Sequence, residues 1–166
     1  TPKPSSAASD VYKRQLLGTS HERISLLPSS TALATLERQS PGQSGLGLVI
    51  AKSLAQLWQD FDYAVIDSPP LLGVLMVNAL AASQQLVIPV QTEHLAVKGL
   101  ERMVNTLAMV NRSRKQPLPF TIVPTLFDRR TQASLGTLRV LRDKFPEEIW
   151  HCLLYTSDAA DEGLGV

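Results

Sequence analysis

The chain has 166 residues, enough for one α/β core. Its 16 basic and 15 acidic residues nearly balance, so the composition does not indicate strong attraction to nucleic acid or to a membrane. A single cysteine excludes a disulfide framework and a cysteine metal cluster, and it suits a reducing cytoplasm. No apolar run approaches the roughly 20 residues needed for a transmembrane helix.

The two ends of the chain, 1–15 and 152–166, are predicted not to be native. Both are rich in small and polar residues and lack apolar periodicity. A DNA string that encodes Ser5–Gln15, when reverse-complemented and read one base out of frame, encodes Cys152–Glu162. The string resembles a transposon-type sequencing adaptor translated at both ends of a DNA fragment, and such scars are excluded from fold reasoning. We therefore expect native sequence, forming a partial domain, over 16–151.

The first part of this insert predicts short elements. The apolar run Arg23–Pro28 predicts a short strand that ends at its proline, and 32–38 suits a short helix. Residues 40–45 predict a loop, whose glycine order is not a phosphate-binding fingerprint because it follows no buried strand and no Lys-Ser/Thr pair closes it. Leu46–Trp58 has the apolar spacing of an amphipathic helix.

The central stretch Tyr63–Asp67 is an unbroken apolar run that ends in one carboxylate. Such a run predicts a strand buried on both faces, as in a parallel sheet. The Ser68-Pro69-Pro70 segment cannot continue a ladder, because proline has no N–H, so the chain must leave the sheet directly after the acid. Leu71–Ala82 is apolar almost all round and predicts a helix packed within the sheet's cover.

The second half alternates strands and helices. Gln85–Val90 and Phe120–Val123 predict buried strands, with Pro89 best suited to an edge or a strand end. Leu95–Val110 and Thr131–Lys144 predict helices. The residues expected on their buried faces are Leu95, Leu100, Met103, Val104, Leu107, Val110, Leu135, Leu138, Leu141 and Phe145.

Crossovers of about a dozen or more residues between strands indicate right-handed βαβ units. The strand ends at Asp67, Gln91 and Thr125 are then expected on one edge of the sheet, where open α/β sheets bind their ligands.

Several ordered blocks resemble the ParA/MinD family of deviant Walker ATPases. They are Tyr63–Pro70, Gly73, Asn78–Ala82, Leu86–Glu93, Gly99–Leu100 and Thr125–Thr131. The resemblance implies a P-loop NTPase-like fold of the SIMIBI class, three-layer α/β/α with a mostly parallel sheet, here truncated. Within the family, Leu26–Ser30 and Pro124–Arg130 look most like the ParA-like proteins that position chemotaxis arrays at cell poles.

The resemblance also implies a site for ATP and Mg²⁺. Asp67 matches the Walker B acid, the catalytic carboxylate that holds Mg²⁺ through water, since phosphate-bound Mg²⁺ needs a fixed anionic oxygen ligand. The other implied nucleotide-binding residues are Ser68, Pro69, Pro70 and Gly73 in the switch that responds to the γ-phosphate, Glu93 near the nucleotide and partner subunit, and Pro124 and Thr125 at the base. From the residues alone, Asp67 can equally be a loop or cap acid, and Glu93 is simplest as an acid at a helix N-terminus.

The family's Walker A loop, Lys-Gly-Gly-x-Gly-Lys-Thr/Ser, is absent from this sequence, together with the strand and helix that flank it. We therefore expect the 166-residue chain neither to bind ATP tightly nor to hydrolyse it. Loss of a central strand also predicts an exposed sheet edge, exposed apolar surface and aggregation.

The resemblance implies that the parent is a bacterial cytoplasmic ATPase, at the nucleoid or a cell pole, that positions or segregates cargo. It would act as a homodimer driven by ATP, with an adaptor or cargo protein as partner and nonspecific DNA as a further one. Two alternatives stay open: a scaffold or adaptor of the same fold without nucleotide chemistry, and a related protein-tyrosine autokinase domain. A Walker A loop encoded upstream of Leu16 would support the ATPase over the scaffold or adaptor. The autokinase alternative predicts a tyrosine-rich C-terminal tail.

Overall fold

The computed structural model describes residues 16–29, 48–57, 59–68 and 73–155. The chain divides into two compact units, Thr1–Ser83 and Gln84–Val166, and each is described by itself below. The helix predicted at 32–38 and the loop predicted at 40–45 lie outside the described residues.

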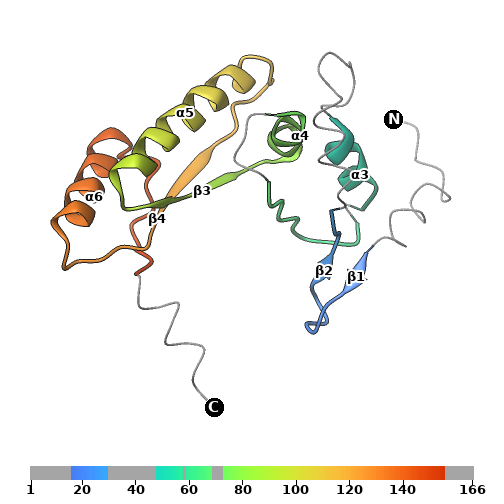
Figure 1. Cartoon of the computed structure of the whole chain (residues 1–166). Coiled ribbons are helices and arrows are strands. Elements are labelled where there is room, and N and C mark those ends of the chain that lie inside the picture. The colour runs from blue at the N-terminus through green and yellow to red at the C-terminus, as the bar shows by residue number, and fades with distance from the viewer. Residues whose placement is uncertain (1–15, 30–47, 58, 69–72, 156–166) are drawn as a thin grey trace. The chain divides into compact units, whose positions relative to one another are not determined.

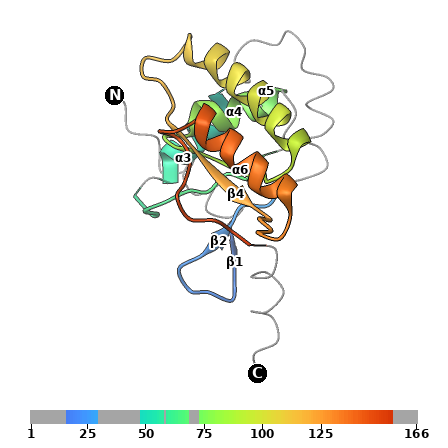
Figure 2. The ribbon, with the colours of Figure 1, turned by 90° about the vertical axis from the view of Figure 1, so that its left-hand side faces the viewer.

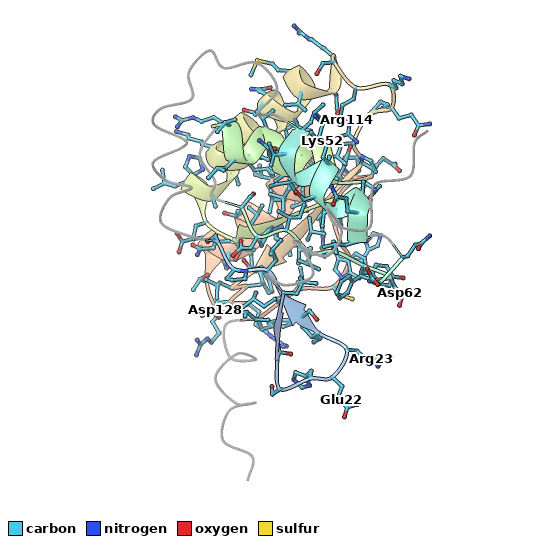
Figure 3. The ribbon with its side chains drawn as sticks, turned by 90° about the vertical axis from the view of Figure 1, so that its right-hand side faces the viewer. Glu22, Arg23, Lys52, Asp62, Arg114 and Asp128 are labelled. Carbon is cyan, nitrogen blue, oxygen red and sulfur yellow. The ribbon has the colours of Figure 1, made fainter. Side chains whose placement is uncertain are left out.

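The first unit begins with a short antiparallel hairpin. Strand β1, Leu17–Gly18, pairs with β2, Ser25–Leu26, and both strands are exposed. The predicted strand at Arg23–Pro28 is thus present but only two residues long. Figure 3 shows the charged residues Glu22 and Arg23 in the turn that joins β1 to β2.

Two predicted helices are confirmed in the same unit. Helix α3 spans Val49–Leu57 and helix α4 spans Val74–Ala82. They pack on each other and supply the buried apolar residues Leu57, Met76, Ala79 and Leu80. Met76, Ala79 and Leu80 of α4 are buried, as expected for a helix that does not lie on an open surface, whereas its predicted place in the cover of the sheet stays a prediction.

The strand predicted at Tyr63–Asp67 is wrong. Residues 63–68 form neither a strand nor a helix, and the side chains of Tyr63 and Val65 are 90% and 96% exposed. A strand is stable only when a neighbour takes its N–H and C=O groups, and no ladder in the described part of the chain includes this segment. An apolar run therefore indicates a capacity to form a buried strand, while the partner strand decides whether that strand forms.

The second unit is built on two parallel strands. Strand β3, Leu86–Gln91, pairs with β4, Phe120–Thr125, in a register that places Leu86 opposite Phe120 and Gln91 opposite Thr125. Helix α5, His94–Asn111, connects them, and helix α6, Gln132–Lys144, follows β4. Figures 1 and 2 show both helices on the same face of this sheet. The prediction of a βαβα order is confirmed here.

Each strand of this parallel pair contains a proline, and the register explains why both are tolerated. The Leu86 N–H donates to Pro119 O (3.0 Å) and the Thr92 N–H donates to Thr125 O (3.2 Å), so the even-numbered residues of β3 direct their N–H groups toward β4. Pro89 therefore has its nitrogen on the other edge of β3, called the free edge here because no strand among the described residues pairs with it, so no ladder bond of the described sheet is lost. An edge position for Pro89 was predicted, and it also blunts that edge.

Residues after α6 lie along the opposite edge of β4. The Ile122 N–H donates to Glu148 O (2.8 Å), and the Leu154 N–H donates to Pro124 O (3.1 Å). Pro124 thus faces this segment with its carbonyl oxygen alone and needs no N–H. The segment includes Cys152–Tyr155, the first residues of the tail predicted to be non-native.

The core of the second unit joins both strands to both helices. Its buried members are Val90, Val97, Leu100, Ile122, Phe127, Leu138, Leu141 and Ile149. Leu95 was predicted in this core but is 76% exposed. It lies two residues before Val97, about 200° around the helix, so it faces solvent when Val97, Leu100 and Leu107 face the sheet. Among the described residues, no helix is long and apolar enough to cross a membrane.

Candidate nucleotide site

The predicted site residues fall in both units. Asp67, Ser68 and Gly73 belong to the first unit, whereas Glu93, Pro124 and Thr125 belong to the second. Pro69 and Pro70 lie outside the described residues. The expectation that Asp67 shares one sheet edge with Gln91 and Thr125 stays a prediction.

Asp67 and Ser68 lie in the segment 59–68 that follows α3 and forms neither helix nor strand, and both residues are exposed. On the other side of the gap, Gly73 is the N-cap residue of α4, with extended backbone (φ −143°, ψ −176°), and its carbonyl accepts the Val77 N–H (3.1 Å). The Asp67 carboxylate is therefore carried on a connection whose two ends are the helices α3 and α4.

Asn78 ties those two helices together. Its Oδ1 accepts the N–H groups of Val49 (2.9 Å) and Ile50 (3.3 Å), and its Nδ2 donates to Val74 O (2.9 Å). The side chain is buried, with 4% exposed. Backbone N–H groups at a helix N-terminus have no partner within their own helix, so a residue of α4 caps α3. This role was not predicted, because Asn78 lies 28 and 29 residues from its partners.

In the second unit, the loops after β3 and β4 lie together. Glu93 is the exposed N-cap residue of α5 and makes no side-chain capping bond. Pro124 is fully buried and Thr125 is half-buried at the end of β4. The Thr92 N–H to Thr125 O bond joins the two loops directly. The structure thus brings together Glu93 and Thr125, two residues that the sequence predicted to share a site.

The β4–α6 loop carries a charged pair at its exposed side. Arg130 donates from Nε and Nη2 to the carboxylate of Asp128 (both 2.9 Å), and its backbone N–H donates to the same group (2.9 Å). These bonds lower the pKa of Asp128 from its ordinary value to about 2, the side-chain bonds having the largest effect, and raise the pKa of Arg130. Figure 3 places Asp128 at the molecular surface. Arg129 instead stacks over the ring of Tyr155, 5.0 Å from its centroid.

The donor set fits half of a Mg²⁺–nucleotide site. Mg²⁺ is usually held by one or two carboxylates, water and the substrate's phosphates, so the single Asp67 carboxylate suits a metal that arrives with phosphate. The described residues hold no group of three His, Cys, Asp or Glu side chains that could bind the ion by themselves. The sequence supplies no Gly-rich loop with a lysine for the phosphates.

A family model described as an AAA domain, AAA_31, matches residues 7–120. The sporulation initiation inhibitor protein Soj of Bacillus subtilis is 29% identical over 137 residues, which cover 82% of this chain and 54% of that protein. The chromosome partitioning protein ParA of Myxococcus xanthus is 28% identical over 132 residues, covering 79% of this chain and 47% of that protein. The chain therefore spans about half the length of these relatives.

A solved structure gives the same result for the fold. Cobyrinic acid a,c-diamide synthase from Mycobacterium smegmatis, with bound ATP analog and magnesium, superposes with a TM-score of 0.72 at 32% sequence identity. The match covers 86% of this chain and 60% of that one. The chain has the α/β fold of P-loop proteins, as predicted.

Proposed function

Because the chain belongs to the AAA domain family that it matches, and within it to the ParA/MinD-type deviant Walker ATPases, we propose that it is part of an ATP-switched positioning protein. Two of its relatives carry the names of a chromosome partitioning protein and of Soj. The proposed parent segregates a chromosome or plasmid, or positions another cargo, by binding ATP as a homodimer and releasing the dimer on hydrolysis.

The observation that carries this proposal is the Asp67 carboxylate at the end of an apolar run, on the connection between two helices tied by Asn78. When bound, Mg²⁺ neutralises charge on the phosphates that it bridges. In our proposal Asp67 supplies the fixed anionic oxygen on the metal side, and Ser68 to Gly73 form the segment that responds to the γ-phosphate. In the second unit, the proposed nucleotide-facing residues are Glu93, in the loop after β3, and Pro124 and Thr125, at the end of β4.

The 166-residue chain is proposed to be inactive. Without the phosphate-cradling loop and its lysine, Asp67 has no phosphate-bound metal to hold. We also propose that 1–15 and 152–166 are adaptor-derived and that the native sequence is 16–151. Mg²⁺-dependent ATP turnover by the purified 166-residue chain would contradict the first of these statements.

We further propose that the parent is a ParA-like protein that positions a chemotaxis array at a cell pole. It would act in a bacterial cytoplasm, with an adaptor or cargo protein as its partner. This assignment rests on the likeness of Leu26–Ser30 and Pro124–Arg130 to such proteins. Chemotaxis genes beside the native gene would support it, whereas cell-division genes or a centromere-binding partner would replace it. Nonspecific DNA is a further proposed partner.

The experiment that tests the proposal is to recover the native DNA upstream of the codon for Leu16. We expect a continuous frame that encodes a Lys-Gly-Gly-x-Gly-Lys-Thr/Ser loop. A continuous frame without such a loop would favour the scaffold or adaptor alternative, and a tyrosine-rich C-terminal tail downstream would favour the autokinase. The same DNA tests the tails, since native codons for 1–15 or 152–166 would contradict an adaptor origin.

A further inference from the structure

Leu126, directly after β4, has an unusual backbone conformation. Its φ is +50°, and it is the only described residue other than glycine with positive φ. This left-handed region costs an L-residue about 1 kcal/mol or more and is strained for a bulky side chain. Burial of the Leu126 side chain does not account for it, because that side chain is 47% exposed. Something outside the residue must hold its backbone.

Two buried hydroxyls bond to this turn. Thr92 comes from the β3–α5 loop and Ser134 from the first turn of α6, and they are 2% and 4% exposed. Thr92 Oγ1 donates to Leu126 O (3.2 Å), Ser134 Oγ accepts the Asp128 N–H (3.2 Å), and the two hydroxyl oxygens lie 2.5 Å apart.

The direction of every bond in this series follows from its ends. A carbonyl oxygen only accepts and a backbone N–H only donates. Since Thr92 gives its one proton to Leu126 O, Ser134 must donate to Thr92. The order is therefore Asp128 N–H to Ser134, Ser134 to Thr92, and Thr92 to Leu126 O. Both hydroxyl protons are used, and Thr92 from the β3–α5 loop and Ser134 from α6 close the turn around Phe127, whose own N–H donates to Leu154 O (3.0 Å).

Buried hydrogen bonds of this kind are costly to leave unmade, because a buried donor or acceptor without a partner has no water to replace it. Releasing Leu126 into ordinary extended or helical backbone would turn its carbonyl away from Thr92. The two bonded hydroxyls thus oppose the local preference of leucine. Strain held by its surroundings is typical of functional loops.

We propose that Thr92 and Ser134 are positioning residues, which hold the Thr125–Asp128 turn in its left-handed form so that Thr125 has a fixed place. This deepens the proposed function and rests on it in one respect, namely that the turn faces the nucleotide. Glu93 adjoins Thr92, so one buried pair sets the arrangement of both nucleotide-facing loops of the second unit.

The test compares Thr92→Val, which keeps the branched shape and removes the hydroxyl, with Thr92→Ser, which keeps the hydroxyl. The readout is NMR of the 166-residue chain: the strong intraresidue HN–Hα cross-peak of a positive-φ residue at Leu126, and amide exchange at Asp128. We expect Thr92→Val to abolish that strong cross-peak and to speed Asp128 exchange about tenfold. Thr92→Ser should keep both near the values of the parent chain.

If Thr92 contributes only to stability, Thr92→Val will be less stable but will keep the strong Leu126 cross-peak. That result would overturn the proposal. If Thr92→Val does not fold, adding Leu126→Gly should restore folding, because glycine adopts positive φ without steric cost. Failure of that rescue would equally overturn it.

Measurements on the proposed longer parent protein distinguish the positioning role of Thr92 from the proposed nucleotide-binding function. There, Thr92→Val should weaken binding of a fluorescent ADP analogue while it converts Leu126 to negative φ. An unchanged affinity for the analogue, together with that conversion of Leu126, would refute the nucleotide role of the turn and leave the positioning role standing.

Discussion

Asn78→Ala tests how the connection that carries Asp67 is anchored. The substitution removes the acceptor of the Val49 and Ile50 N–H groups and the donor to Val74 O, all within a side chain that is 4% exposed. Loss of an N-cap costs about 1 kcal/mol, and loss of one further buried hydrogen bond costs about the same. We therefore expect α3 to lose about 2 kcal/mol of stability against local opening.

The assay is native-state amide exchange on the 166-residue chain. About 2 kcal/mol corresponds to a roughly 30-fold loss of protection for the α3 amides. The matched control is Ser53→Ala on the same helix. Ser53 Oγ donates to the helix's own Val49 O (3.0 Å), and its removal should leave protection unchanged or slightly higher. A change below about threefold in Asn78→Ala would refute the cap as the link between α3 and α4.

Three further predictions concern the second unit. In Arg130→Gln, the pKa of Asp128, measured by NMR titration, should rise from about 2 toward its ordinary value near 4. In the unaltered chain the folded-state pKa is depressed, so the ionised Asp128 carboxylate stabilises the fold above about pH 4, and this contribution is lost as the pH falls through about 2. An Asp128 midpoint unchanged by the substitution would contradict the assigned cause. Leu141→Ala should lower the free energy of unfolding in urea by about 2–5 kcal/mol, since Leu141 is 0% exposed in the core; a loss below about 1 kcal/mol would contradict that packing. Pro89→Val should leave the melting temperature nearly unchanged but increase self-association measured by light scattering, because it adds an N–H to the free edge of β3. Ile88→Pro should instead destabilise the fold, because it removes a donor of the β3–β4 ladder. Equal effects of the two substitutions would contradict the register.

Helices α3, α4, α5 and α6 were predicted to within a few residues because their signals are local. Apolar spacing at three and four residues, and prolines beyond the ends, act within one helical turn of the residues that they affect. The strands β3 and β4 were also predicted from short apolar runs, and each forms because the other is its ladder partner. The edge position of Pro89 follows from the chemistry of one residue.

The strand at Tyr63–Asp67 could not be settled in this way, because its formation depends on a neighbour elsewhere in the chain. The same limit applies to the buried polar side chains. Thr92 reaches Leu126 and Ser134 across 34 and 42 residues, and no spacing in the sequence marks such pairs. The site residues were predicted from the resemblance to the family, and neither the hydroxyls of Thr92 and Ser134 nor the amide of Asn78 was among them.

The strand ends at Gln91 and Thr125 were predicted to share one edge of the sheet, and the register of β3 and β4 confirms this. Each is the last residue of its strand, and parallel strands in register end at the same edge. Asp67 is different, because its predicted place depends on a sheet that includes Tyr63–Asp67. Its metal role rests on the family resemblance and on its place at the end of the connection from α3.

The central claim is that Asp67 is the metal-side carboxylate of an ATPase. The most direct measurement is Mg²⁺-dependent ATP hydrolysis by the proposed longer parent protein, compared between the unaltered form and Asp67→Asn, with Asp62→Asn as the matched control in the same connection. We expect Asp67→Asn to lower kcat by at least about 100-fold, because it removes the anionic oxygen next to the metal, and Asp62→Asn to have little effect. Equal activity of the unaltered protein and Asp67→Asn would contradict the account.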